Sequence, residues 1–131
     1  MHEVSYRVYY EDTDSGGVVY YANYLKFAER ARTELLRSIN INQSSLVETD
    51  NILFVVSHVE MDLIKSAKLD DLLSITTKVE KISGASIQMC QSITRDELTL
   101  CNIKVKIACV DKNISPVRLP KEIKEKFKNL I

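Results

Sequence analysis

The feature that most constrains the fold is one long helical pattern set among strand-like segments. Apolar residues recur at helical spacing from Leu25 to Ile39, and Glu and Arg fill the opposite face. Residues 2–10 precede this pattern with the period-two alternation of a strand, and β-branched runs follow it as far as residue 110. One helix must therefore cover a sheet made from most of the remaining chain, which predicts an α+β fold in two layers.

Turn signals divide the C-terminal part into four runs. The expected strands are residues 52–64, 71–82, 87–95 and 99–110. Short turns between β-branched runs predict an antiparallel meander. Residues 40–51 are polar and predict a loop with a short helical turn, and residues 121–131 predict a short amphipathic helix after Pro116 and Pro120. No repeat or change in composition divides the 131 residues, so we expect a single domain, residues 1–131.

Composition narrows the class of function. The 18 Lys and Arg residues balance 18 Asp and Glu residues, so the net charge of zero gives no indication of a nucleic-acid partner. No apolar run has the form of a signal peptide or approaches the roughly 20 residues of a membrane span, so we expect a cytoplasmic protein. The cysteines, Cys90, Cys101 and Cys109, are odd in number and lack C-x-x-C spacing. They favour buried, reduced thiols over a zinc site.

The stretch EDTDSGGVVYYANY, Glu11 to Tyr24, contains two of the three glycines and four of the six tyrosines. A strand-to-helix turn accounts for part of it, because glycines relax the backbone and Asp12 and Ser15 can bond local N–H groups. Asn23 is a candidate N-cap for the following helix. The tyrosines fit a plain turn less well, since a buried tyrosine needs a partner for its hydroxyl. They indicate an apolar cleft with polar tips.

Three other interpretations of DTDSGG are disfavoured. Asp14-Ser15-Gly16 matches the signature of aspartic proteases, but those enzymes need two such aspartates, which here would require dimerisation, and they have an all-β fold. Asp12 and Asp14 could begin a calcium loop, but Asn23 stands where the bidentate Glu is required. The Gly-x-x-x-x-Gly-Lys of a phosphate-binding loop is absent.

A carboxylate directly before a helix indicates a different chemistry. The start of a helix presents unpaired N–H groups and a partial positive charge, which can hold a developing oxyanion. Asp14 can attack the same carbonyl or activate water against it. Two histidines are too few to argue a Ser-His-Asp set, so the pattern favours hydrolysis of an electrophilic acyl group such as a thioester.

The segment RVYYEDTDSGGVVYYANYLKFAERARTELLR, Arg7 to Arg37, resembles the 4-hydroxybenzoyl-CoA thioesterase family. Within that family it is most similar to the small acyl-CoA thioesterases of the bacterial Tol-Pal cluster, as is AKLDDLLSITTKV further along. The resemblance implies a hotdog fold, in which a curved antiparallel sheet of about five strands wraps a long central helix. It also implies homodimers joined at their sheet edges, often paired into homotetramers, with active sites at the dimer interface.

The resemblance also implies roles for particular residues. The catalytic aspartate of the family falls on Asp14, as nucleophile or as base for water, and the backbone N–H that polarises the thioester falls on Tyr21. Asn23 matches an asparagine with a positioning or capping role. Tyr20 and Tyr24 are further candidates for substrate binding, either lining an aryl pocket or packing the helix against the sheet. No metal and no cofactor is implied.

This chain departs from the close subgroup at Tyr21 and at Ser66, and for Ser66, where the subgroup has proline, we expect only a local effect on the strand. The close subgroup has a histidine where this chain has Tyr21, and tyrosine is a poor proton shuttle near neutral pH because its ordinary pKa is about 10. The aryl-CoA enzymes place basic residues near the turn that matches SGAS, which is neutral here. Lys65, Lys68, Lys81 and Arg118 remain as candidates for the CoA phosphates, although each is more typical of an ordinary surface charge.

We therefore expect an acyl-CoA thioesterase that converts its acyl-CoA substrate to free acid and CoA. The alternatives are a non-catalytic acyl-CoA-binding or protein-interaction module of the same fold, serving lipid-synthesis partners, and a thioesterase for acyl carrier protein. Glu29 is a further catalytic candidate, because some hotdog thioesterases use a helix glutamate in place of the loop aspartate. The favoured interpretation is that Glu29 belongs to a charge network at the surface or at a dimer interface. His58 lies in the middle of a predicted strand, where a structural or exposed position is favoured over a catalytic one.

Overall fold

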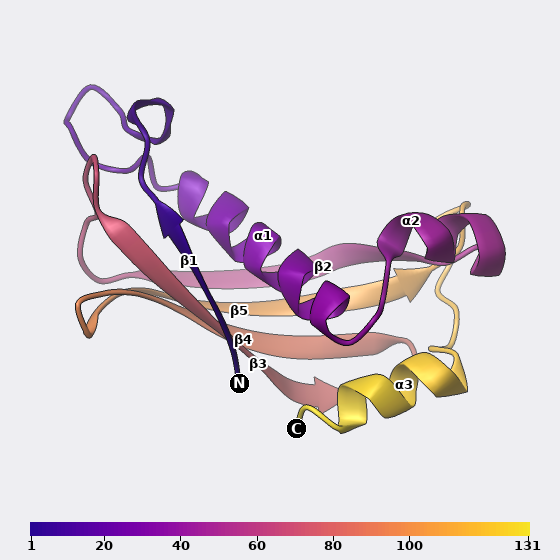
Figure 1. Ribbon diagram of the computed structural model, residues 1–131. Helices are drawn as coiled ribbons and strands as arrows, with labels where there is room; N and C mark the ends of the chain where they lie inside the picture. Colours follow the sequence, from indigo (N-terminus) through magenta and orange to yellow (C-terminus); the bar gives the residue numbers. More distant parts are fainter.

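The computed structural model describes residues 1–131 and confirms an α+β fold (Figure 1). Five antiparallel strands form one sheet in the order β1-β3-β4-β5-β2. The strands are β1 His2–Arg7, β2 Leu53–Leu63, β3 Leu72–Ile82, β4 Ser86–Arg95 and β5 Leu98–Val110. The long helix α1, Asn23–Ser38, lies over the inner face of the curved sheet. This arrangement is the hotdog fold that the resemblance implied.

The predicted meander is confirmed for three strands and wrong for the fourth. Tight turns join β3 to β4 and β4 to β5, which pair as consecutive hairpins. Strand β2 does not pair with β3; its partner is β5, with Leu53 opposite Val110 and Leu63 opposite Cys101. Residues 64–71 form a longer connection than a hairpin turn, so β2 can occupy one edge of the sheet, while β1 pairs with β3 at the other edge.

The sheet is too wide for one helix to cover. Four gaps of about 4.8 Å separate the axes of the two outer strands by about 19 Å, whereas a helix with its side chains is about 10–12 Å wide. Helix α1 packs mainly against β1, β3 and β4. The inner face over β5 and β2 is consequently left partly uncovered beside the helix.

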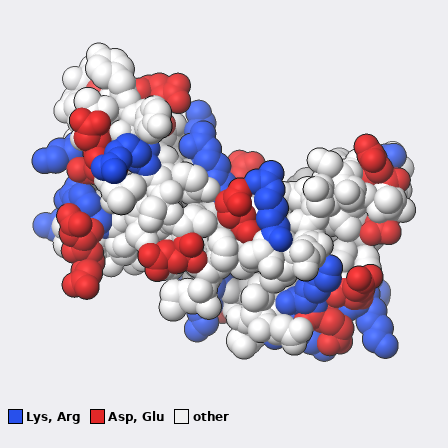
Figure 2. Space-filling view, viewed as in Figure 1, with Lys and Arg blue, Asp and Glu red and all other residues white.

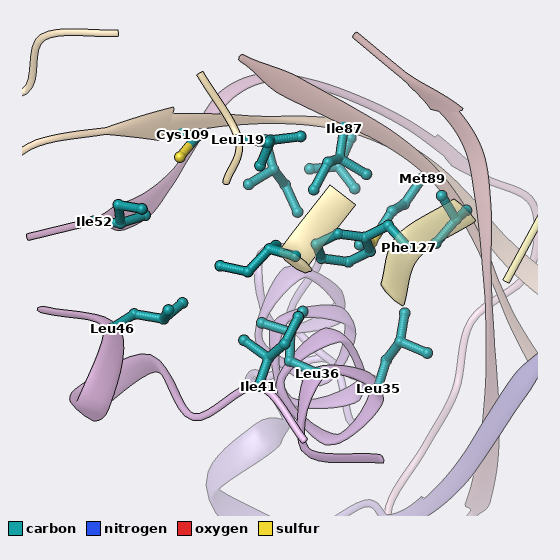
Figure 3. Close-up of a cluster of buried hydrophobic side chains, with 14 residues drawn as sticks. Leu35, Leu36, Ile41, Leu46, Ile52, Ile87, Met89, Cys109, Leu119 and Phe127 are labelled. Atoms are coloured by element: carbon teal, nitrogen blue, oxygen red, sulfur yellow. The ribbon is translucent and has the colours of Figure 1, made fainter. Parts of the chain in front are cut away.

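Two clusters of buried apolar side chains fill the space between the helices and the sheet. One of 13 residues surrounds the N-terminal half of α1 and includes Phe27. The other, of 14 residues, surrounds the C-terminal half, and Figure 3 shows Phe127 lying among them with Leu36 and Met89. Phe127 belongs to the C-terminal helix α3, Lys121–Lys128, so the amphipathic helix predicted there is part of the core.

The remaining segments adjust the predicted boundaries. Strand β1 ends at Arg7, because the chain then makes a 3₁₀ turn over Tyr10–Asp12 that leaves Tyr10 exposed. The predicted loop 40–51 contains a short helix, α2 Gln43–Ser45, that continues into a π-helical turn, Leu46–Asp50. None of the helices has the length and apolar character needed to cross a membrane.

A buried polar network ties α1 to the sheet. The side chain of Gln91, which is 3% exposed, donates through Nε2 to the carbonyl oxygen of Ala28 at 2.9 Å and to Oγ1 of Thr77 at 3.0 Å. Its Oε1 accepts from Nη1 of Arg32 at 2.9 Å, and burial lowers the pKa of that guanidinium. Both polar atoms of the Gln91 amide therefore have partners, and the network links α1 to β3 and β4.

We expect Gln91→Ala to lower the free energy of unfolding by about 2–4 kcal/mol, because it leaves buried polar groups without partners and opens a cavity. Urea unfolding at fixed protein concentration measures the change. Gln88→Ala, on the outer face of β4, is the matched control and should cost about 0.5 kcal/mol or less. Equal losses in the two variants would show that the network does not stabilise the fold.

Candidate active site

The loop between β1 and α1 presents Asp14 at a tight turn. The N–H of Gly17 donates to the carbonyl oxygen of Asp14 at 3.0 Å, and the N–H of Gly16 donates to its carboxylate oxygen Oδ1 at 2.8 Å. Gly17 has a φ of +81°, which a glycine adopts without strain. A Cβ at Gly16 would lie 3.1 Å from Oδ1 of Asp14. The two glycines therefore allow the turn and leave the carboxylate room.

Hydrogen bonds from both sides hold this loop in place. The carboxylate of Asp12 accepts from the N–H of Tyr9 at 2.8 Å, which confirms the local role expected for Asp12. The N–H of Val19 donates to the carbonyl oxygen of Ala67 at 2.8 Å, and the N–H of Ala67 donates to the hydroxyl of Tyr24 at 3.0 Å. Ala67 is fully buried, so the connection between β2 and β3 anchors the loop.

The prediction that Asn23 caps α1 is wrong. Asn23 is the first residue of the helix, and Ala22 stands at the N-cap position without a side-chain cap. A turn precedes the helix, because the N–H of Asn23 donates to the carbonyl oxygen of Tyr20 at 2.8 Å. The side chain of Asn23 points back instead, and its Nδ2 donates to the carbonyl oxygen of Asp12 at 2.9 Å. Asn23 thus ties the Asp14 loop to the helix.

The start of α1 offers free hydrogen-bond donors beside Asp14. The backbone N–H groups of Tyr21 and Ala22 donate to no acceptor in the chain. Tyr21 and Asp14 line the same pocket, which has a volume of about 240 Å³. The other residues of its wall are Val18, Val19, Tyr24, Leu63, Ile64, Lys65 and Ser66. Both Asp14 and Tyr21 are exposed, so the pocket is open to solvent in a single chain.

The tyrosines take different positions. Tyr24 lines the pocket but is 3% exposed, and burial raises the pKa of its phenol. Tyr20 lies outside the pocket wall, with its ring centroid 4.9 Å from that of Tyr21. A hydrogen bond with the Tyr21 hydroxyl raises the pKa of Tyr20. Of the candidate substrate-binding residues, the structure thus brings only Tyr24 to the pocket that contains Asp14 and Tyr21, and Tyr20 and Asn23 lie beside it.

Sequence reasoning missed the contribution of the connection between β2 and β3. Lys65 and Ser66 line the same pocket as Asp14, whereas the sequence favours an ordinary surface charge for Lys65. Asp71 holds this connection: its carboxylate accepts from Nη1 of Arg95 at 2.7 Å and from the N–H of Lys68 at 2.9 Å. A long-range bridge between Val18 and Lys68 joins this connection to the Asp14 loop, and no local sequence pattern indicates that bridge.

Other candidate residues lie away from Asp14. Glu29 lines a different cavity and makes no ion pair. His58 is exposed, as expected, and pairs with Glu60 at 3.2 Å. The SGAS turn has no charged residue of its own, but the guanidinium of Arg118 lies beside it. Nη1 of Arg118 is 4.0 Å from the position that a Cβ on Gly84 would take.

The cysteines form no disulfide. Cys101 and Cys109 are buried strand thiols, as expected, and burial raises the pKa of Cys101 to about 11. Cys90 is only half-buried, with its Sγ 3.0 Å from Oε2 of Glu80.

The fold and the site together define a hotdog protein with a carboxylate beside the open start of its central helix. The family model described as thioesterase superfamily matches residues 16–102, and the chain belongs to that superfamily. The matched range begins two residues after Asp14.

Two curated relatives match almost the whole chain. The chain is 50% identical to the acyl-CoA thioesterase YbgC of Haemophilus influenzae over 125 residues, which are 95% of this chain and 92% of that protein. It is 44% identical to the acyl-CoA thioester hydrolase YbgC of Escherichia coli over 124 residues, 93% of this chain and 92% of that one. These matches confirm the resemblance found in the sequence.

Solved structures agree with the fold. A probable thioesterase from Bartonella henselae superposes with a TM-score of 0.88 at 40% identity and covers 91% of this chain and 98% of its own. Slr0204, a 1,4-dihydroxy-2-naphthoyl-CoA thioesterase from Synechocystis, superposes with a TM-score of 0.90 over 98% of this chain and 96% of its own. Its identity is 20%, so this second likeness shows the fold alone.

The Asp71 carboxylate accepts hydrogen bonds from Arg95 and from the N–H of Lys68, an arrangement that we call the Asp71 clasp. We expect this clasp to make the free energy of unfolding depend on pH in the acid range. Burial raises the pKa of Asp71, but hydrogen bonds from Lys68 and Arg95 outweigh it, and the net pKa lies below the ordinary 3.8. The stabilisation is therefore complete above pH 3.8 and is lost as pH falls through the lower folded value. In urea unfolding from about pH 5 to about pH 2, Asp71→Asn should lose less stability on acidification than the wild type.

Asp70→Asn is the matched control for this prediction. Asp70 is the adjacent exposed aspartate, its carboxylate makes no hydrogen bond or ion pair, and asparagine tolerates its positive φ. The control should keep the wild-type response to acid. An Asp71→Asn variant that also kept that response would contradict the assignment of this pH dependence to the clasp.

Proposed function

We propose that this protein hydrolyses the thioester of an acyl-CoA substrate to free acid and CoA. The observation that carries the proposal is that exposed Asp14 lines one pocket together with Tyr21, whose backbone N–H donates to no acceptor in the chain. The names of the YbgC relatives support the same substrate class. The role of each residue within the reaction is part of the proposal.

The chemistry needs only these two groups and water. A carbonyl oxygen placed at the start of α1 accepts from the N–H of Tyr21, and the helix stabilises the negative charge that develops on it. Asp14 then acts by one of two routes. As a base, it takes a proton from water, whose oxygen bonds to the acyl carbon. As a nucleophile, it forms an anhydride that water opens. In both routes the carbon–sulfur bond breaks and the thiolate of CoA takes up a proton.

The replacement of histidine by Tyr21 is compatible with this role. The proposed donor is a backbone N–H, which any side chain leaves in place. The Tyr21 side chain is 55% exposed at the edge of the pocket, where it is available to contact the substrate. Lys65, in the same pocket, is a cation near the approach of an anionic CoA. The chemistry therefore does not depend on a histidine.

The proposed active form is a homodimer. Strand β2 is an edge strand of 11 residues, and Val56, Val59 and Leu63 along it are 50%, 43% and 52% exposed. A long apolar edge is a template for pairing with another strand. Pairing of two β2 strands would join the sheets and cover one side of each open pocket. We propose that the protein acts in the cytoplasm, where thiols such as that of Cys90 stay reduced.

Asp14→Asn should lower turnover by a factor of about 10² to 10⁴, because the amide keeps the shape of the side chain but neither attacks nor takes a proton. Release of free thiol from a panel of CoA thioesters, corrected for the protein's own cysteines, measures it. Asp12→Asn is the matched control and should retain most of the turnover, because the Asp12 carboxylate accepts only the N–H of Tyr9 in its own turn and the backbone carbonyl that Asn23 contacts is unchanged.

Three outcomes of that assay separate the competing functions. Retention of turnover by Asp14→Asn would contradict the role of Asp14. Absence of wild-type turnover on every CoA thioester, in a protein that binds them, would favour a non-catalytic binding module. Faster hydrolysis of the same acyl group on acyl carrier protein than on CoA would assign the carrier protein as the substrate.

A further inference from the structure

A second cavity of the protein does not contain Asp14. It has a volume of about 300 Å³ and lies between the C-terminal half of α1, the first residues of β2 and helix α3. Polar side chains that are exposed or half-buried, Glu29, Arg32 and Gln43, stand at its mouth. Its floor is apolar and buried and includes Met89 and Phe127. A polar mouth above an apolar floor is typical of a ligand site.

The walls of this cavity are held firmly. Arg32 is fixed by its hydrogen bond to Gln91, which itself is bonded to the backbone of α1. Phe127 meets Phe54 edge to face, with ring centroids 6.3 Å apart and an interplanar angle of 89°. In Figure 3 the ring of Phe127 lies beside Met89 in the middle of the buried cluster. Phe127, on α3, is thus a fully buried part of the cavity wall that Phe54 holds in place.

Asp14 and this cavity lie at opposite ends of β2 within one chain. The cavity is lined by Phe54–Val56, and the Asp14 pocket by Leu63. Val56 and Leu63 are seven residue steps apart along the strand, which is about 23 Å at about 3.3 Å per step. If two β2 strands pair antiparallel along their full length, Leu53 of one strand lies opposite Leu63 of the other. The cavity end of one strand then lies beside the Asp14 end of its partner. The cavity of one protomer then adjoins the Asp14 pocket of its partner.

We propose that this cavity holds the apolar end of an unbranched acyl chain whose thioester carbonyl lies at the partner's Asp14, and that Phe127 is the end wall that limits chain length. The inference rests on the proposed function, since it takes the ligand to be acyl-CoA. The buried apolar floor, which includes Met89 and Phe127, matches methylene groups. Helix α3, which is outside the sheet and its central helix, would therefore set substrate specificity.

The test measures binding of S-alkyl-CoA thioethers of increasing chain length by calorimetry. These ligands have no thioester bond, so they report on binding whether or not the protein hydrolyses acyl-CoA. On the wild type, affinity should rise about fourfold for each added methylene until the chain reaches Phe127, and then stop rising. On Phe127→Leu, the chain length at which the gain stops should be longer.

Two further variants make the test decisive. Phe27→Leu removes the same atoms from the other core cluster, away from the cavity, and should leave the limiting chain length unchanged. Thr33→Phe fills the cavity from the surface of α1 and should shorten the limit, which keeps the test usable if Phe127→Leu does not fold.

The outcomes distinguish this inference from the proposed function. An affinity that does not depend on chain length would show that the cavity does not hold the acyl chain and would overturn the inference. A limit that neither Phe127→Leu nor Thr33→Phe moves would do the same, even if thioesters were hydrolysed. Chain-length-dependent binding with shifted limits, in a protein without turnover, would support this pocket while contradicting the proposed hydrolysis.

Discussion

The structure depends on the packing of one helix against a sheet that is too wide for it. Helix α1 lies on β1, β3 and β4, and the buried amide of Gln91 fixes it there through the carbonyl oxygen of Ala28. Because the helix lies to one side, the inner face near β2 has room for a cavity, and β2 itself has an unpaired edge. The uncovered inner face near β2 therefore results from the position of α1 on the sheet.

The same packing places the chemical groups. The N-terminal end of α1 has no side-chain cap, so the N–H groups of Tyr21 and Ala22 remain free. The loop before the helix is held by Asn23 on one side and by Ala67 on the other, and it presents Asp14 to the same pocket. In the space-filling view the tip of this end of the molecule is uncharged and has acidic groups beside it, and acidic and basic groups are interspersed over the rest of that face (Figure 2). Asp14 thus shares its pocket with the apolar side chains of Val18, Leu63 and Ile64, which suit an acyl group.

Local patterns in the sequence predicted most of the elements but not their pairing. The period-two runs located β3, β4 and β5, because alternation and turn chemistry are properties of neighbouring residues. They did not show that β2 pairs with β5, since that choice depends on contacts between Leu53 and Val110, far apart in the chain. The loop motif identified Asp14 and Tyr21, whereas Lys65 entered the pocket through a long-range bridge that no local pattern encodes.

The central claim is that one chain holds only part of each active site, and dilution tests it most directly. Turnover per chain would be measured over a range of protein concentrations, with the dimer fraction determined by sedimentation at each one. Turnover per chain should fall in proportion to the dimer fraction. A monomer with the full turnover of the dimer would contradict the account.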